Sequence, residues 1–109
     1  MRVAIKDPGE DWMWIDIDPT LEQLQKLVGG HIECAPQVTN AIIYCNEDGL
    51  ELDLMPNVEI YEGIEDDDDF LMLLVGPIVM MGPVDDNGNE TELTRELFDE
   101  TLDYMEDNT

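Results

Sequence analysis

The sequence predicts one α+β domain, residues 1–109, with a mostly antiparallel sheet, one short helix and one C-terminal helix. Two observations predict this class: short β-favouring runs alternate with turn residues, and two segments carry apolar residues at helical spacing. A chain of 109 residues with 43% hydrophobic side chains can form one core, and it is too short for a second domain.

The first two predicted strands are RVAI and WMWIDID, joined by a turn at Asp-Pro-Gly, residues 7–9. They are expected to form a hairpin. In the second strand Met13, Ile15 and Ile17 alternate with Trp12 and Trp14, so one face is aliphatic and the other carries two tryptophans beside acidic residues.

The short helix is predicted over residues 20–28. Thr20 and Gln23 have the spacing of a capping box, and Gly-Gly at residues 29–30 ends the helix. One apolar stripe runs along it, formed by Leu21, Leu24, Leu27 and Val28.

Further strands are predicted at HIEC, AIIYC and LELDL, the last two joined in a hairpin by residues 46–49. The apolar run 70–81 makes one bent strand or two, because Pro77 cannot donate to a sheet and belongs at an edge or bend. Asn87-Gly88 is a strong turn signal.

The C-terminal helix is predicted over residues 95–106. Its expected buried face consists of Leu97, Phe98, Thr101, Leu102 and Met105. The opposite face is acidic to the end of the helix, where carboxylates oppose the helix dipole, so we expect these carboxylates to serve a purpose other than helix stability.

Three segments of the chain resemble a known family: TLEQLQKLVGGHIE, NEDGLELDLMPNVEI and GPIVMMGPVDDNGNETELT. Together they are similar to the signature segments of the domain of unknown function 3846 family, and the resemblance extends from Ile15 to about Thr94. This family occurs in phages, plasmids and assorted prokaryotes. The resemblance implies a single compact domain without an established activity, and it assigns no functional residue.

The net charge of −24 restricts the partners of the protein. No Lys or Arg occurs between Lys26 and Arg95, so we expect no direct binding to nucleic acid phosphates or to an anionic membrane. The expected partner is a basic protein surface. The sequence shows no secretion signal, and the apolar run 70–81 is too short to span a bilayer, so we expect a cytoplasmic protein.

Enzymatic and metal chemistry find little support in the sequence, and we expect no enzyme activity, no cofactor and no metal site. His31, Cys34 and Cys45 supply only three zinc ligands without a second close pair, so buried thiols and a helix-capping histidine are the favoured interpretation. The positions of an EF-hand loop are partly matched by Asp85, Asn87, Asn89 and Glu96. However, Glu90 occupies the place that needs Gly, and a hairpin turn explains this segment better.

The candidate partner-binding residues are acidic side chains and two tryptophans: Glu59, Glu62, Glu65, Asp66, Asp67, Asp68, Asp69, Glu96, Asp99, Glu100, Asp103, Glu106, Trp12 and Trp14. Exposed tryptophans beside acids would suit an Arg-rich partner, but burial under a helix is the favoured alternative for Trp12 and Trp14. The four consecutive Asp residues are also expected to act as charged gatekeepers that keep the adjoining apolar strand soluble.

Two hypotheses compete for the acidity. In the first, carboxylates imitate nucleic acid phosphates, and the protein is a phage- or mobile-element-encoded, non-enzymatic inhibitor that fills the basic channel of a host restriction or CRISPR-type defence protein. In the second, the acidity is adaptation of a halophilic protein to a high-salt cytoplasm. A third possibility is an acidic adaptor that binds one basic protein.

Overall fold

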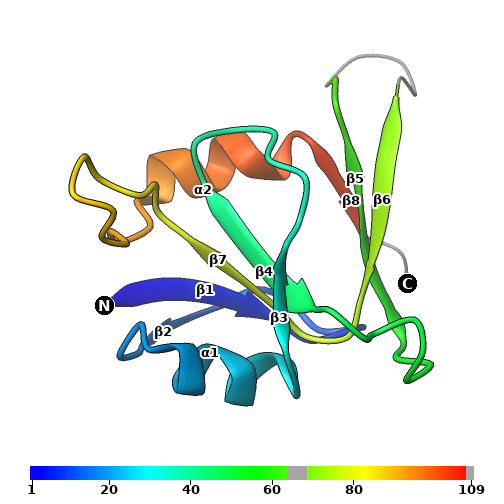
Figure 1. Cartoon of the computed structure of the whole chain (residues 1–109). Coiled ribbons are helices and arrows are strands. Elements are labelled where there is room, and N and C mark those ends of the chain that lie inside the picture. Colours follow the sequence, from blue (N-terminus) through cyan, green and yellow to red (C-terminus); the bar gives the residue numbers. More distant parts are fainter. Residues whose placement is uncertain (64–68, 108–109) are drawn as a thin grey trace.

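The computed structural model describes residues 1–63 and 69–107. Within them the chain forms two antiparallel sheets and two short helices, which confirms the predicted α+β class. The larger sheet has the strand order β2-β1-β7-β4-β3 and the smaller one the order β6-β5-β8 (Figure 1). The element bounds are β1 Arg2–Lys6, β2 Met13–Asp16, α1 Leu21–Val28, β3 Ile32–Cys34, β4 Ile42–Asn46, β5 Pro56–Tyr61, β6 Phe70–Val75, β7 Ile78–Met81, α2 Arg95–Leu102 and β8 Met105–Asp107.

The N-terminal predictions are confirmed. β1 and β2 pair as an antiparallel hairpin, with Val3 opposite Ile15. In α1 the Thr20 hydroxyl accepts a hydrogen bond from the backbone N–H of Gln23 at 3.1 Å, and Gly29 ends the helix in the left-handed conformation. Leu24 and Val28 are buried, but Leu21 in the predicted apolar stripe is 59% exposed because it lies in the first turn, beyond the edge of the sheet contact.

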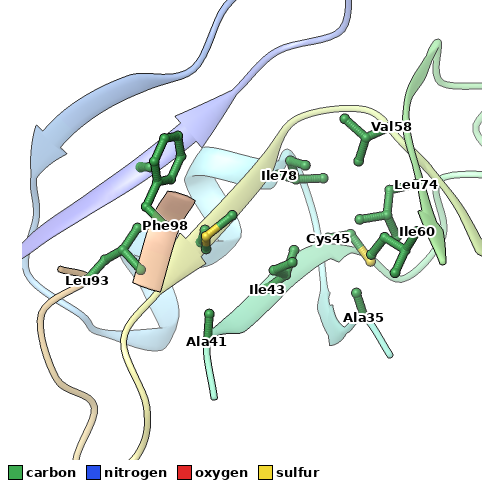
Figure 2. Close-up of a cluster of buried hydrophobic side chains, with 12 residues drawn as sticks. Ala35, Ala41, Ile43, Cys45, Val58, Ile60, Leu74, Ile78, Leu93 and Phe98 are labelled. Carbon is green, nitrogen blue, oxygen red and sulfur yellow. The ribbon is translucent and has the colours of Figure 1, made fainter. Parts of the chain in front are cut away.

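The helices cover opposite faces of the larger sheet (Figure 1). Leu24 and Val28 of α1 pack in one core cluster with Val3 and Val79. Phe98 of α2 packs in the other cluster, which also contains Ile60 of the smaller sheet. The second core therefore lies between the larger sheet, α2 and the smaller sheet, where Figure 2 shows its side chains.

The predicted hairpin of AIIYC with LELDL is wrong. AIIYC does form β4, but β4 pairs with β3 and β7 instead. Residues 47–53 fold into successive turns, with Leu52 N–H donating to Asp48 O and Leu54 N–H donating to Gly49 O. The alternation of LELDL does not give a strand because β4 already has partners on both edges, and Leu50 and Leu52 point to solvent.

The apolar run 70–81 forms two strands, one of the two outcomes predicted. β6 belongs to the smaller sheet and β7 lies at the centre of the larger one. The chain changes sheet at Gly76, whose φ of +74° favours glycine, and a Cβ there would lie 2.6 Å from Leu54 Cδ1.

The C-terminal helix is shorter than predicted. It ends at Leu102, with Asp103 as its C-cap, and Met105–Asp107 form β8 rather than a further helical turn. The last turn contains no basic residue to offset the helix dipole, whereas β8 gains hydrogen bonds along β5 and lets Met105 pack against the core. Neither helix in the described part of the chain is long and apolar enough to cross a membrane.

The two sheets are joined by a buried polar contact that the sequence did not predict. Lys6 at the end of β1 is only 2% exposed, and its ammonium donates to Asn57 Oδ1 at 2.8 Å and to Asp107 Oδ1 at 3.3 Å. Asn57, fully buried in β5, donates in turn to the backbone carbonyls of Lys6 and Gly76. Hydrogen bonding thus compensates the burial of a charge where β1, β5 and β8 meet.

Candidate functional site

The outer face of α2 carries a group of exposed carboxylates. Thr94 caps the helix by accepting from Leu97 N–H at 3.1 Å, and Phe98 and Thr101 anchor the inner face in the core. The opposite side chains are exposed: Glu96, Asp99, Glu100 and the C-cap Asp103. Arg95 Nε lies 3.2 Å from Asp99 Oδ1, but both partners are more than half exposed, so this pair holds the carboxylate only weakly.

Glu106 was predicted on the helix and instead lies in β8, exposed, directly opposite Glu59 of β5. The acids of α2 nevertheless continue along the chain into this pair of strands. We call Glu96, Asp99, Glu100, Asp103 and Glu106 the acidic row.

Tyr61 lies between the two glutamates of the strand pair. Its hydroxyl donates to Glu59 Oε1 at 2.8 Å and approaches Glu106 Oε2 at 3.4 Å. The hydrogen bond to Glu59, followed by desolvation and the two negative charges, raises the pKa of Tyr61 to about 12. A neutral phenol donor between two carboxylates lowers their mutual repulsion.

Two of the remaining predicted acids, Glu62 and Asp69, lie at the far end of the β5–β6 ribbon. Glu62 is exposed, and its N–H donates to the carbonyl of Asp69 at 3.0 Å. Asp69 is exposed and has a φ of +53°. Glu65, Asp66, Asp67 and Asp68 lie outside the described residues, so their part in the predicted acidic surface and the gatekeeper role of the Asp run stay predictions.

Trp12 and Trp14 pack beneath α2. Both are half-buried and meet the Phe98 ring edge-on, with ring centroids 5.5 Å and 5.1 Å away. The Arg2 guanidinium lies 4.8 Å from the centre of the Trp14 ring. The favoured interpretation, burial under a helix, describes these tryptophans well: they hold the base of α2, while their partly exposed edges line recesses of about 470 Å³ at Trp12 and about 300 Å³ at Trp14.

The zinc candidates do not converge. Cys45 is buried, with its thiol donating to Glu33 O at 3.6 Å, but Cys34 is exposed, which corrects the expectation of two buried thiols. His31 is 74% exposed, and its Nδ1 lies 3.7 Å from Asp48 rather than at the carbonyls of α1. In the part of the chain that the structure describes, no three His, Cys, Asp or Glu side chains are placed to hold a metal ion.

Neither cysteine is activated by its surroundings. Burial raises the pKa of Cys45 to about 11, and desolvation together with the Glu90 and Glu33 carboxylates raises the pKa of Cys34. Both thiols are therefore held in the protonated form, which is a poor nucleophile.

The EF-hand-like segment is a turn. Asp85 Oδ1 accepts from the N–H groups of Asn87 and Asn89, both at 2.9 Å, and Gly88 has a φ of +81°. Asp85 therefore caps its own turn, as the hairpin interpretation predicted. Glu90 contacts Tyr44, whose hydroxyl donates to Glu90 Oε1 at 3.3 Å. Burial and the Glu90 carboxylate raise the pKa of Tyr44 to about 12.

Sequence reasoning missed two features of this surface: the phenol of Tyr61 between paired glutamates, and the Lys6–Asn57–Asp107 contact. The sequence carried no signal for the second. Alternation places Lys6 on the same strand face as Arg2 and Ala4, opposite the face of Val3 and Ile5, and a face with two basic residues is expected to be exposed. Nothing in the sequence singled out Asn57 as a buried acceptor for Lys6.

The fold and its surface define the protein as a small acidic α+β domain of two antiparallel sheets. Comparison with known families shows which one: residues 1–106 match the domain of unknown function DUF3846, and the chain belongs to this family. The match confirms the resemblance seen in the three sequence segments. No curated protein and no solved structure matches the chain.

Proposed function

We propose that this chain is a non-enzymatic binding protein whose acidic row imitates nucleic acid phosphates and occupies the nucleic-acid channel of a basic protein. The spacing of carboxylates on α2 carries the proposal. From Glu96 to the C-cap Asp103 the helix rises about 10 Å, so the four acids are on average roughly 3.5 Å apart along the helix axis. One strand of B-DNA carries a charge about every 3.4 Å along the axis.

The anchoring of the row supports the same function. Phe98 and Thr101 fix α2 on the core, and Glu106 is held in a sheet, so the backbone that carries these carboxylates is ordered before a partner arrives. A preorganised surface loses less conformational entropy on binding than a flexible acidic tail does.

The target class we name is a host defence protein with a basic nucleic-acid channel, of the restriction or CRISPR type. The family that the chain resembles occurs in phages and plasmids as well as in assorted prokaryotes, and phages and plasmids benefit from blocking such enzymes. The negative charge of the whole molecule would also speed its encounter with a basic channel.

Inhibition of DNA cleavage by a panel of restriction and RNA-guided nucleases tests the proposal. The row variant carries Glu96→Gln, Asp99→Asn, Glu100→Gln and Asp103→Asn. A matched control neutralises the same number of exposed acids elsewhere: Glu10→Gln, Asp11→Asn, Glu47→Gln and Glu51→Gln. We expect the row variant to lose at least about tenfold in inhibition and the control to lose much less.

Two results would contradict the proposal. Equal losses in the two variants would mean that net charge acts without regard to position, and a wild-type protein that inhibits no member of the panel would exclude these target classes.

The salt-adaptation alternative makes a separate prediction for thermal unfolding. It expects an unfolded chain at about 0.1 M salt and a folded one near 1 M, where the screening length falls from about 10 Å to about 3 Å. Imitation of nucleic acid expects a folded chain at both.

A further inference from the structure

β6 is an open edge of the smaller sheet. This sheet has the order β6-β5-β8, and no strand among residues 1–63 and 69–107 pairs with the outer side of β6. Figure 1 shows β5 and β6 extending from the body as a twisted ribbon whose strands cross in this view, with β6 on the outer side over its first half. Phe70–Val75 contain no charge and no proline, so the strand lacks two of the features that usually prevent strand addition, and the bulge at Leu71 lies toward its Phe70 end.

The hydrogen-bonding direction identifies the free groups. Tyr61 donates its N–H to Tyr104 O, on the β8 side of β5, so Ile60 and Val58 turn their main-chain groups toward β6. Their partners in register are Met72 and Leu74. The N–H and C=O groups of Leu73, which lies between them opposite Glu59, therefore point outward along the open edge. Leu71 has no partner in register, because the pairing with β5 shifts between Ile60 and Tyr61.

Apolar side chains mark both ends of this edge. Phe70 is 54% exposed and Leu71 38% exposed at one end. At the other end Met55, whose carbonyl accepts from Gly76 N–H at 2.8 Å, is 69% exposed, and Leu50 in the same loop is 75% exposed. An incoming strand would gain apolar contacts at each end as well as main-chain hydrogen bonds between them.

Charge decides which strand can fill this edge. A second copy of the chain would bring another −24 charges against this body, so β6-to-β6 pairing is opposed by repulsion. An incoming strand opposite Leu73 would lie two strand spacings, about 9.6 Å, from Glu59, which is within the screening length at about 0.1 M salt. Glu62 and Asp69 lie at the Phe70 end, so cationic side chains would be attracted along the length of the strand.

We propose that β6 accepts an extended Lys- and Arg-bearing segment of a partner protein as a fourth strand of the smaller sheet. Backbone pairing supplies the affinity, and the surrounding carboxylates select a basic segment. The site goes beyond the proposed function, because it uses the main chain of β6 and not the carboxylates of α2.

The probe is a blocked peptide of alternating Lys and Val, matched in length to β6 and added to the isotope-labelled protein. A matched peptide of alternating Glu and Val is the charge control. We expect the largest amide NMR shift at Leu73 with the Lys-Val peptide, and weak or absent binding of the Glu-Val peptide. Two further peptides carry backbone N-methyl groups. The first is N-methylated at every Lys, and the second is N-methylated at every Val. Since a strand pairs through one edge, we expect one of them to lose at least about tenfold in affinity and the other to bind like the parent.

Equal binding of the parent and both N-methylated peptides would overturn the proposal, because adhesion by charge alone does not need N–H donors. Binding of the Glu-Val peptide as tightly as the Lys-Val peptide would overturn the basic occupant. Self-association through β6 at about 1 M salt, observed by sedimentation, would identify a second copy as the occupant instead.

Two protein variants complete the test. Leu73→Pro removes one outward N–H without removing a hydrogen bond to β5, and it should weaken binding of the peptide. If this variant does not fold, the N-methylated peptides provide the test. The row variant defined above should bind the peptide through Leu73 as the wild-type protein does. Loss of nuclease inhibition in the row variant with unchanged peptide binding therefore separates the two proposals.

Discussion

Replacing Asn57 with alanine should cost the protein a large part of its stability. Asn57 is fully buried and makes three hydrogen bonds: Oδ1 accepts from the Lys6 ammonium at 2.8 Å, and Nδ2 donates to Lys6 O at 2.9 Å and Gly76 O at 2.8 Å. Alanine cannot replace any of them. Two carbonyls lose this donor, and among the described residues the buried ammonium keeps one acceptor, Asp107 at 3.3 Å.

The magnitude follows from these losses. A buried polar group left without its partner costs about 1–3 kcal/mol, and more when the group is charged. Asp107 is half exposed and water can reach that side of the ammonium, so the ammonium contributes less than a fully dry charge would. We therefore expect Asn57→Ala to lower the free energy of unfolding by about 3–5 kcal/mol, against a typical total of about 5–15 kcal/mol for a domain.

Urea unfolding followed by tryptophan fluorescence measures this change, because Trp12 and Trp14 pack against Phe98 in the core and are exposed on unfolding. Asn40→Ala is the matched control: Asn40 is exposed, and its replacement should change stability by less than about 0.5 kcal/mol. A loss below about 1 kcal/mol for Asn57→Ala at an unchanged urea slope would refute the conclusion that this contact holds the two sheets together.

Two further predictions concern the candidate site. The folded state raises the pKa of Tyr61 to about 12, above its ordinary value near 10. Between these pH values the folded protein keeps a proton that the unfolded chain has lost. The contribution of Tyr61 to the free energy of unfolding should therefore decrease as pH rises from about 10 to 12. The titration of Tyr61 is measured as the difference in phenolate absorbance between wild type and Tyr61→Phe, and its midpoint should lie above the ordinary value. Glu59→Gln should lower this midpoint. An equal lowering by Glu62→Gln would contradict the assigned hydrogen bond. Thr94→Ala should destabilise the fold by about 1 kcal/mol in thermal unfolding through loss of the α2 cap, and a change indistinguishable from zero would mean that this end of α2 contributes little to the stability of the fold.

Local signals predicted several elements correctly because nearby residues determine them. Thr20 and Gly29 delimit α1 by their own hydrogen bonding and backbone conformation, and Asp85 closes the turn at Gly88 within a few residues. The alternation in WMWIDID correctly separated Ile17, which packs with Val3, from the tryptophans that meet Phe98.

Competition between distant partners explains the failures. LELDL has the alternation of a strand, yet both edges of β4 are taken by β3 and β7, so this segment turns instead. Residues 105–107 have the spacing of a helix, yet pairing with β5 displaces the helical turn and moves Glu106 into a sheet. The candidate site changed accordingly: the acids of α2 were predicted, but the pairing of Glu106 with Glu59 around Tyr61 was not.

The sequence by itself determined the α+β class, the family, the extreme acidity and the elements that short-range capping and turn residues define. Only the tertiary structure decided that there are two sheets, that Lys6 is buried against Asn57 and Asp107, and that β6 is left as an open edge. The physical reason is that caps and turns are closed by neighbours a few residues away. Strand partners and buried charges are settled by contacts between residues as far apart as Lys6 and Asp107, for which neither residue alone carries a signal.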